Sequence, residues 1–404
     1  MYFVFLYALF LTLPKVFLSI LQWNFLKKER EKEAYILEKE QFKKAADYGI
    51  IQQKLSFFES FVDLAVIAFF ILFGFSFLDE NITLSGDFKS VAFVLSFLVI
   101  SSLVSLPFNV YRTLIVDKKF GFNKGGVKVF VQDFVKAMLM LLIIGGAVIY
   151  AFSFVIGNIQ NWEIYAFILA AVLIVLINVF YPTVIAPMFN KFTPLEDKNL
   201  AGAIDNLLER VGFHSKGVFV MDASKRDGRL NAYFGGIGRN KRVILFDTLL
   251  EKIPQNSLLA VLGHELGHFK HKDVFKMMAM VLAFLAFLFF LVGNLPQSLF
   301  ASANLTQSPY ALIVFLLILS GPIGFYFGIL INLLSCQNEF NADKFGASLT
   351  SNEDLAKALL KLVKENNAFP LAHPLYMKFY YSHPPLMARL MALHCENLIN
   401  KENS

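Results

Sequence analysis

Seven long apolar stretches constrain this chain more than any other feature, because each is long enough, or nearly so, to cross the ~30 Å hydrocarbon core of a bilayer. They are Tyr2–Leu21, Phe57–Leu78, Val91–Val110, Ala137–Ile156, Ile164–Ile185, Val274–Val292 and Tyr310–Leu334. Of the 404 residues, 56% are hydrophobic and only 17% are charged, which is more apolar than a typical soluble protein. The first stretch lacks the basic start and small-residue cleavage site of a signal peptide, so we expect a retained helix. The sequence therefore predicts a mainly α, polytopic membrane protein with seven transmembrane helices.

The Lys and Arg residues of the loops alternate between the two sides of the predicted membrane. The loop after the first span is rich in both, the loop at about 79–90 carries only Lys89, and the loops 157–163 and 293–309 carry none. Basic residues accumulate in cytoplasmic loops, so we expect the N-terminus outside and the C-terminus in the cytoplasm, in a bacterial inner membrane rather than the endoplasmic reticulum. The same rule accounts for the net charge of +6. We find no nucleic-acid motif and expect no nucleic-acid partner.

Two segments outside the spans divide the chain into four parts. Residues 1–188 hold the first five spans, 189–273 form a soluble segment, 274–334 hold spans six and seven, and 335–404 form a second soluble segment. Both soluble segments fall on one predicted face, so they can meet as one small domain on the cytoplasmic side. The charged stretch 27–44 predicts a solvated helix that continues the first span.

The first soluble segment has the pattern of strands followed by a helix. Residues 217–222, 231–236 and 241–247 predict three short strands, with turn residues at 238–240 between the last two. A helix is predicted to open at Pro254. Strands followed by a histidine-bearing helix are the layout that a zincin-like peptidase needs.

That helix contains VLGHELGHFKHKD, residues 261–273. His264 and His268 are four residues apart, so on a helix both imidazoles lie on one face and can reach a single ion. Glu265 lies between them, where it can act as general base toward a water on the metal without displacing a ligand. A catalytic zinc needs three protein ligands and an open position. The motif supplies two of the three.

The third ligand is predicted in NEFNAD, residues 338–343, just after the seventh span. Glu339 is the candidate ligand, and Asp343, one turn later, could hold the distal nitrogen of a ligand histidine. The alternative is a solvated acidic helix face. We expect His271 to be no ligand, and Asp273 to be an interfacial charge rather than a partner of the site.

Several longer motifs resemble the type I CAAX prenyl endopeptidase family of integral-membrane zinc metalloproteases. They are LPFNVYRTLIVDKKFGFNK (106–124), YPTVIAPMFNKFTPLED (181–197), NAYFGGIGRNKRVILFDTLL (231–250), HELGH, EFNAD and YSHPPLMARL (381–390), in matching order and spacing. The resemblance covers most of the chain. It implies seven helices that enclose a water-filled chamber, closed at one end by a site with one Zn²⁺ per chain.

The resemblance also implies roles for particular residues. His264, His268 and Glu339 would bind zinc, with Glu265 as the base. Asn231 and Ala232 would lie on an edge strand that pairs with the substrate backbone. His383 would stabilise the developing oxyanion, and Arg389 would pair with a nearby carboxylate. One departure is Cys336, at a position where the family often has arginine.

The function predicted from these features is a membrane-embedded zinc metalloendopeptidase that cleaves membrane-associated peptides or proteins. Whether it recognises prenyl groups stays open. The alternative, from a different class, is a non-proteolytic membrane chaperone or metal-binding scaffold. Glu265 argues against the alternative, because a site that only binds metal needs no general base. We expect membrane lipid and a peptide or protein substrate as partners, and a monomer.

Overall fold

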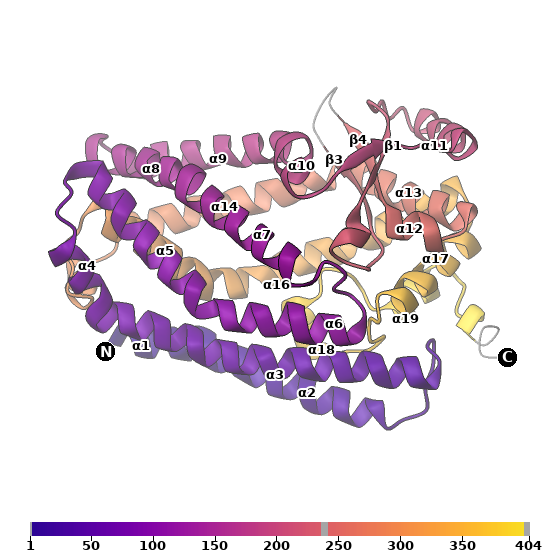
Figure 1. Ribbon diagram of the computed structural model, residues 1–404, viewed down its shortest axis with the longest axis horizontal. Coiled ribbons are helices and arrows are strands. Elements are labelled where there is room, and N and C mark those ends of the chain that lie inside the picture. The colour runs from indigo at the N-terminus through magenta and orange to yellow at the C-terminus, as the bar shows by residue number, and fades with distance from the viewer. Residues whose placement is uncertain (1, 236–240, 400–404) are drawn as a thin grey trace.

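The membrane-spanning part agrees with the prediction from the sequence. The structure, a computed structural model, describes residues 2–235 and 241–399 (Figure 1). Within these residues, seven helical segments are long and apolar enough to cross a membrane, and each contains one predicted stretch. The segments are Tyr2–Arg30, Lys39–Asn81, Gly86–Phe120, Gly126–Asn158, Trp162–Phe189, Asp273–Gly293 and Pro309–Leu349. The predicted seven spans are confirmed, and most continue as helix beyond the apolar stretch.

Short π-helical turns interrupt the first five segments. The elements in chain order are α1 (Tyr2–Tyr7), η1 (Ala8–Thr12), α2 (Leu13–Arg30), α3 (Lys39–Phe69), η2 (Phe70–Gly74), α4 (Phe75–Asn81), α5 (Gly86–Val110), η3 (Tyr111–Asp117), α6 (Lys118–Phe120), α7 (Gly126–Met140), η4 (Leu141–Gly145), α8 (Gly146–Asn158), α9 (Trp162–Phe180), η5 (Tyr181–Ile185) and α10 (Ala186–Phe189). The sixth and seventh segments are α14 (Asp273–Gly293) and α16 (Pro309–Leu349), joined through α15 (Gln297–Ala301). Pro107 lies just before η3 and Pro182 within η5, where a missing N–H loosens the regular helical ladder.

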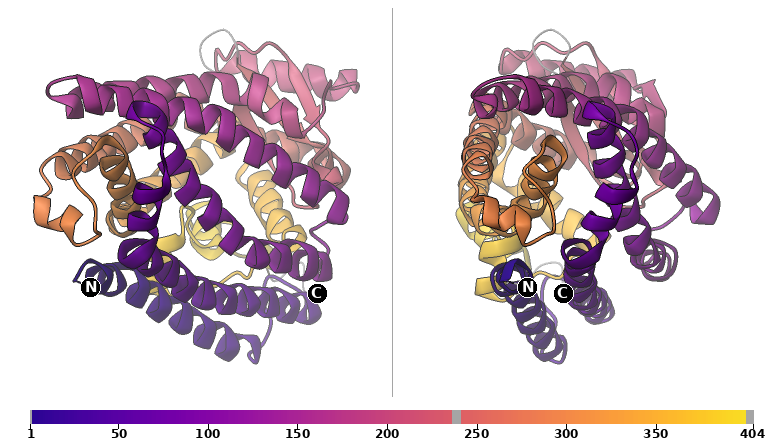
Figure 2. Two further views of the ribbon diagram at one scale, coloured as in Figure 1. Left: turned by 60° about the vertical axis from the view of Figure 1, so that its left-hand side comes forward. Right: turned by 90° about the vertical axis from the view of Figure 1, so that its left-hand side faces the viewer.

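The spans pack as a ring in the order α2, α3, α5, α8, α9, α14 and α16, and α16 closes the ring against η1. Both views in Figure 2 show these helices arranged around a common centre. At one end, the first turns of α16 also pack against α5 and α8, and a buried aromatic cluster that includes Phe75, Phe93 and Phe315 fills the space. Many large apolar side chains elsewhere on the spans are exposed, as expected for helices that face lipid.

The other end, at the right of Figure 1, carries a four-stranded sheet. Its strands are β1 (Phe192–Pro194), β2 (Val218–Met221), β3 (Ala232–Gly235) and β4 (Arg242–Phe246), in the order β1-β2-β4-β3. β2 and β4 are parallel, whereas β1 runs antiparallel to β2 and β3 runs antiparallel to β4. The strand order places β3 at an edge of the sheet. The three predicted strands are β2, β3 and β4. The predicted turn at 238–240 lies outside the described residues.

Helices surround this sheet and join it to the spans. They are α11 (Lys198–Arg210), η6 (Ala223–Lys225), α12 (Asp247–Lys252), α13 (Gln255–Lys270), α17 (Asn352–Glu365), α18 (Pro374–Tyr380) and α19 (Leu386–Ala392). α13 packs against α16, α17 and β3. Leu258, Leu262 and Leu266 of α13 are buried with the apolar faces of β4 and α11. The sheet therefore fixes the position of the predicted metal-binding helix.

The prediction of a continuous helix over residues 27–44 is wrong. α2 ends at Arg30 and α3 begins at Lys39, with a non-helical turn between them. Ile36 and Leu37 are each only 1% exposed, because they pack into a cluster with α17 and α19. Two apolar side chains within a charged stretch thus anchor the first two spans to the C-terminal helices, and burying them requires the chain to leave the helix.

Candidate active site

The backbones of α13 and α16 are in direct contact where the two helices cross, because small residues occupy the crossing. A methyl group added at Gly267 would lie 2.7 Å from Cα of Ala342, and one added at Gly346 would lie 2.5 Å from the backbone N of His264. A methyl group added at Gly263 would lie 3.2 Å from both Cα and the carbonyl oxygen of Gly346. Carbon atoms prefer separations of about 3.5–4.0 Å, so larger side chains here would push the helices apart. These glycines bring the acidic face of α16 against the histidine face of α13.

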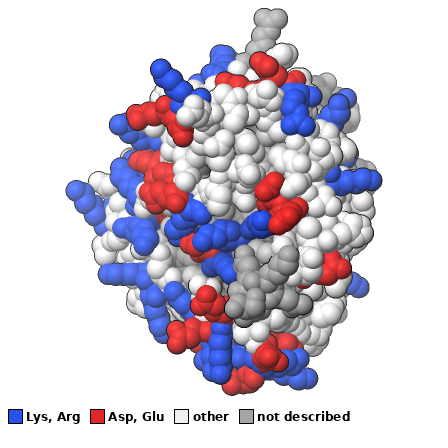
Figure 3. Space-filling model, turned by 90° about the vertical axis from the view of Figure 1, so that its right-hand side faces the viewer, with Lys and Arg blue, Asp and Glu red and all other residues white. Residues whose placement is uncertain are grey.

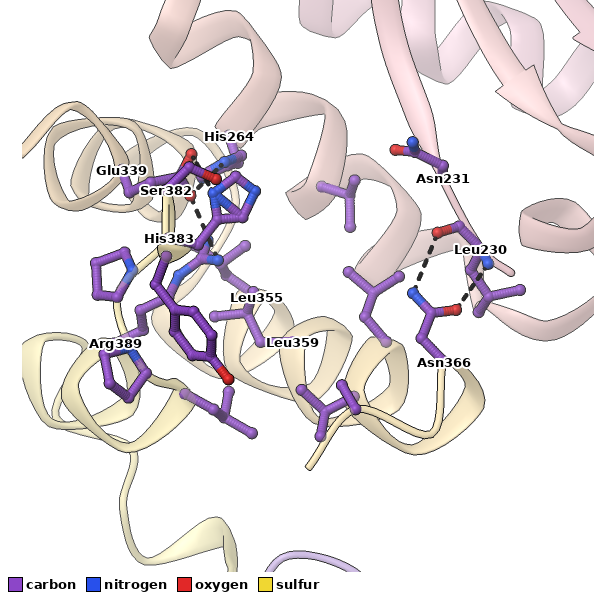
Figure 4. Close-up of a pocket in the computed structure, with 18 of the residues that line it drawn as sticks. Leu230, Asn231, His264, Glu339, Leu355, Leu359, Asn366, Ser382, His383 and Arg389 are labelled. Carbon is purple, nitrogen blue, oxygen red and sulfur yellow. Dashed lines mark hydrogen bonds and ion pairs between the residues drawn. The ribbon is translucent and has the colours of Figure 1, made fainter. Parts of the chain in front are cut away.

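The crossing brings together His264 and His268 of α13 and Glu339 of α16 (Figure 4 labels His264 and Glu339). Each residue offers one donor atom, and the three atoms lie within 4.8 Å of one another. Nε2 of His264 is 3.5 Å from Oε2 of Glu339, and Nε2 of His268 is 3.2 Å from Oε1. The two Nε2 atoms are 3.2 Å apart. Two imidazole nitrogens and a carboxylate oxygen converging on one point are a donor set that suits Zn²⁺.

Carboxylates also face the opposite nitrogen of each imidazole. Nδ1 of His264 lies 2.8 Å from Oδ1 of Asp343, although this contact is not aligned as a hydrogen bond. Nδ1 of His268 is hydrogen-bonded to Oδ2 of Asp273 at 2.9 Å, and Lys276 donates to the other oxygen of Asp273 at 2.8 Å. Asp273 is only 4% exposed, so the expectation of an interfacial charge at this position is wrong. Such contacts fix which nitrogen of a histidine is free to bind a metal.

Arg389 of α19 links the two carboxylates of α16. Its guanidinium donates two hydrogen bonds to Asp343, at 2.7 and 2.6 Å, and lies 3.4 Å from Oε2 of Glu339. Fork-like pairing of this kind fixes both partners in orientation. Cys336, one turn before Glu339, places its Sγ 3.6 Å from the carbonyl oxygen of Tyr381. The thiol therefore contacts the chain that leads to His383.

The electrostatic environment differs among the titratable groups of the site. Burial raises the pKa of the Glu265 carboxyl; the charges of His264 and His268 oppose this rise, and the charge of Glu339 adds to it. Burial alone would lower the pKa of His268, but hydrogen bonds to Glu339 and Asp273 raise it to about 9. His383 has its Nδ1 3.4 Å from Oε1 of Glu339, and 64% of its side chain is exposed. Desolvation by the surrounding protein atoms lowers its pKa, and the charge of Glu339 opposes this shift. A carboxyl with a raised pKa is suited to proton transfer near neutral pH. A histidine with a lowered pKa is neutral at that pH and is suited to donate a hydrogen bond from its ring N–H.

A cavity of about 750 Å³ opens in front of these groups. His264, Glu265, His268, Glu339 and His383 line one side of it. Apolar side chains of α17 and the segment after it form much of the rest, among them Leu355, Leu359, Leu362, Val363 and Phe369. The cavity is large enough for several residues of a peptide and has the mostly apolar wall with a few polar groups that is common in binding sites.

Asn231 and Ala232 form the opposite rim of this cavity (Figure 4 labels Asn231). Ala232 is the first residue of the edge strand β3, and Asn231 precedes it, with its carbonyl oxygen accepting from the backbone N–H of Phe246. Asn366, which follows α17, is hydrogen-bonded to the backbone of Leu230, the residue before Asn231. Its side-chain oxygen accepts from the backbone N–H of Leu230 at 2.8 Å and its amide donates to the carbonyl of Leu230 at 3.4 Å.

No sequence pattern indicates Asn366, which lies far along the chain from the strand that it holds. The small residues at the helix crossing were likewise missed, although Gly263 and Gly267 are part of the motif itself. A glycine one position before each histidine of the motif, on a helix that otherwise lacks glycine, is a signal that could have predicted a close helix crossing.

Comparison with known proteins places the chain in a family. The model for peptidase family M48 matches residues 194–397, and the model for the CAAX prenyl protease N-terminal region with five membrane helices matches residues 22–191. A CAAX prenyl protease 1 homolog of Arabidopsis thaliana is 32% identical, covering 90% of this chain and 89% of that protein. The chain belongs to the CAAX prenyl protease 1 family.

Other members of the family agree with this placement. CAAX prenyl protease 1 of Saccharomyces cerevisiae is 33% identical over 73% of this chain and 69% of its own length. The crystal structure of S. mikatae Ste24p superposes with a TM-score of 0.87 at 28% identity, covering 97% of this chain and 99% of that one. The chain is thus an integral, multi-pass membrane metalloendopeptidase. The predicted fold class, seven membrane helices that enclose a chamber with a small α+β region, is confirmed.

Proposed function

We propose that this member of the CAAX prenyl protease 1 family hydrolyses peptide bonds of membrane-associated peptides or proteins at a single zinc site. His264, His268 and Glu339 would hold the ion. The supporting observation is that their three donor atoms, from two different helices, lie within 4.8 Å of one another, while Asp343 and Asp273 face the far nitrogens of the histidines. A solvated acidic helix face would leave Glu339 exposed, whereas it is 4% exposed and directed at both histidines.

Zinc, when bound, supplies a Lewis acid that makes water a nucleophile near neutral pH. Glu265 is the base that takes the proton of the attacking water. Its position on α13 places it at the cavity beside both histidines, and its raised pKa brings the carboxyl closer to the working pH of a general base. The same carboxyl can then deliver a proton to the leaving amine.

The remaining predicted residues receive roles on either side of the reacting bond. The free edge of β3, starting at Asn231 and Ala232, would align the substrate backbone as an added strand. His383, whose ring lines the cavity near Glu339, would donate to the oxyanion as it develops. Arg389 would not touch the substrate, but would hold Asp343 and Glu339 in place through the contacts described above.

We infer the setting of the reaction from the charges of the loops. Residues 189–273 and 335–404 would form one catalytic domain on the cytoplasmic face, with 1–188 and 274–334 in the membrane and the N-terminus outside. The named relatives are CAAX prenyl proteases, so lipidated peptides are one candidate substrate class and other membrane-associated polypeptides are the second. We favour a monomer in a bacterial inner membrane.

The test compares the purified protein with a Glu265→Gln variant on an internally quenched peptide. The variant should keep its zinc and its melting temperature but lose activity by at least about 10³-fold, because the base is removed while the ligands stay. Glu209→Gln is the matched control, because it makes the same replacement at an exposed glutamate of α11. This variant should behave like the parent. An active Glu265→Gln protein would refute the mechanism, and an inactive parent that binds zinc would favour the non-proteolytic scaffold.

A further inference from the structure

Two adjoining hollows lie outside the candidate active site, between α3 and the segment formed by α5, η3 and α6. The first, of about 560 Å³, is lined by charged side chains, and the second, of about 480 Å³, is lined mostly by apolar ones. Ile51 and Lys54 form part of the wall of both. The two hollows therefore make one amphiphilic groove along α3, which we call the α3 groove.

The charged half of the α3 groove is basic. Its charged lining residues are Glu40, Lys43, Lys44, Asp47, Lys54 and Lys119. Arg30 already neutralises Asp47 through hydrogen bonds of 2.6 and 3.1 Å. In the described part of the chain, none of the four lysines forms an ion pair with a carboxylate. Four lysines thus face one remaining carboxylate, Glu40, and Figure 3 shows Lys and Arg side chains gathered along the left and lower left of this end of the molecule.

The apolar half faces away from the catalytic cavity. Leu55, Phe58, Pro107 and Phe108 line it together with Tyr111, and the side chain of Phe58 is 59% exposed. Helical periodicity places Phe58 on the same side of α3 as Ile51.

The opposite side of α3 faces inward. Gln53 lies there and donates a hydrogen bond of 2.8 Å to the hydroxyl of Tyr376 of α18, whose neighbours Tyr380 and Tyr381 line the catalytic cavity. The α3 groove is therefore on the outer surface of the helix ring, where lipid surrounds the protein.

The groove also lies at the right depth for a lipid headgroup. The long apolar part of the second span begins at about residue 57, so Lys54 sits one turn outside it. Trp23 of α2 lies beside the groove, with Nζ of Lys54 5.0 Å and Nζ of Lys27 5.1 Å from its ring centroid. Tryptophan beside lysine is typical of the level of the headgroups.

We propose that the α3 groove binds an anionic glycerophospholipid. The lysines contact the phosphate and the charged headgroup, and one acyl chain lies against Phe58 and Phe108. Charge complementarity selects an anion, and the continuous apolar half selects a ligand with a hydrocarbon tail over a soluble phosphate. Binding depends on neither the zinc site nor peptidase activity.

The experiment is native mass spectrometry of the full-length protein released from detergent micelles that contain equal amounts of phosphatidylglycerol and phosphatidylcholine. The parent should retain phosphatidylglycerol selectively. Lys44→Glu/Lys54→Glu should weaken that retention by at least about tenfold, since each lysine near a lipid surface contributes about a factor of five. Lys118→Glu/Lys128→Glu makes the same charge change on exposed lysines outside the groove and should retain lipid like the parent.

A third variant tests the apolar half. Phe58→Asp should also weaken retention, because it puts a carboxylate where the acyl chain lies, and melting temperatures verify that each variant is folded. Equal loss in both lysine pairs would overturn the site in favour of a diffuse charge effect. Unchanged retention in Phe58→Asp, or equal retention of the two lipids by the parent, would overturn it as well.

Discussion

Replacing Gly346 by alanine tests whether the backbone contact between α13 and α16 sets the geometry of the metal site. The new methyl group would lie 2.5 Å from the backbone N and 2.8 Å from Cα of His264. Neither neighbour is a flexible side chain, so the helices must separate by about 1 Å to reach an ordinary carbon contact. Zinc ligands tolerate deviations of only about 0.2 Å.

Glu339 moves with α16 and both histidines move with α13, so this separation acts directly on the distance between the ligands. We expect weaker zinc binding and a fall in kcat/KM on the order of 10²-fold at saturating zinc, as for other displacements of about 1 Å in catalytic sites. Zinc content after dialysis and peptide hydrolysis measure the two effects. Gly328→Ala is the matched control, because Gly328 lies on the same helix but a methyl group added there would meet no packing neighbour within 4 Å. If both variants bind zinc and hydrolyse peptide equally well, the close crossing does not position the ligands.

Three further outcomes follow from the contacts around the site. Asn366→Leu should lower kcat/KM about tenfold with zinc content unchanged, because it removes the two hydrogen bonds that hold Leu230 beside the edge strand. A loss of zinc would show instead that Asn366 supports the metal site. Asp273→Asn should weaken zinc binding about 10- to 100-fold, since it removes the carboxylate behind His268, and chelator competition with unchanged affinity would contradict this. In the metal-free protein, burial lowers the pKa of His268, but the hydrogen bonds to Glu339 and Asp273 raise it to about 9. Because the proton must leave before the ring binds metal, zinc affinity should rise about tenfold per pH unit below about pH 9 and level off above it. A zinc affinity that does not change with pH would contradict the assignment of His268 as a ligand.

The parts of the site that lie within one helix could be predicted from the sequence, because helical spacing alone places His264 and His268 together. Glu339 could be proposed because an acidic pair with the same spacing of four residues, Glu339 and Asp343, follows the seventh span on the same predicted face. Asp273 could not be recognised in the same way. Lys272 adopts a left-handed conformation with φ of 58°, which reverses the chain between α13 and α14 and returns Asp273 to the far side of His268.

Elsewhere in the fold, too, features that depend on contacts between distant parts of the chain could not be predicted from the sequence. The seven spans follow from apolar length, a property that each stretch carries by itself. The turn that buries Ile36 depends on α17 and α19, more than 300 residues later in the chain, and the hold of Asn366 on Leu230 depends on a contact between residues 136 positions apart. The pattern of residues within a short stretch of sequence cannot indicate packing partners that lie so far apart in the chain.

The single helix α16 has a mechanical consequence. It runs for 41 residues, with Pro322 inside it, about 60 Å at 1.5 Å per residue, from the aromatic cluster at one end to the candidate metal ligand Glu339 near the other. A rod held at its far end acts as a lever, and a change in tilt of about 2° displaces a point 45 Å from the pivot by roughly 1.5 Å. Helix tilt responds to the thickness of the surrounding bilayer. We therefore expect the hydrocarbon thickness of the host membrane to bear on the spacing of Glu339 from His264 and His268.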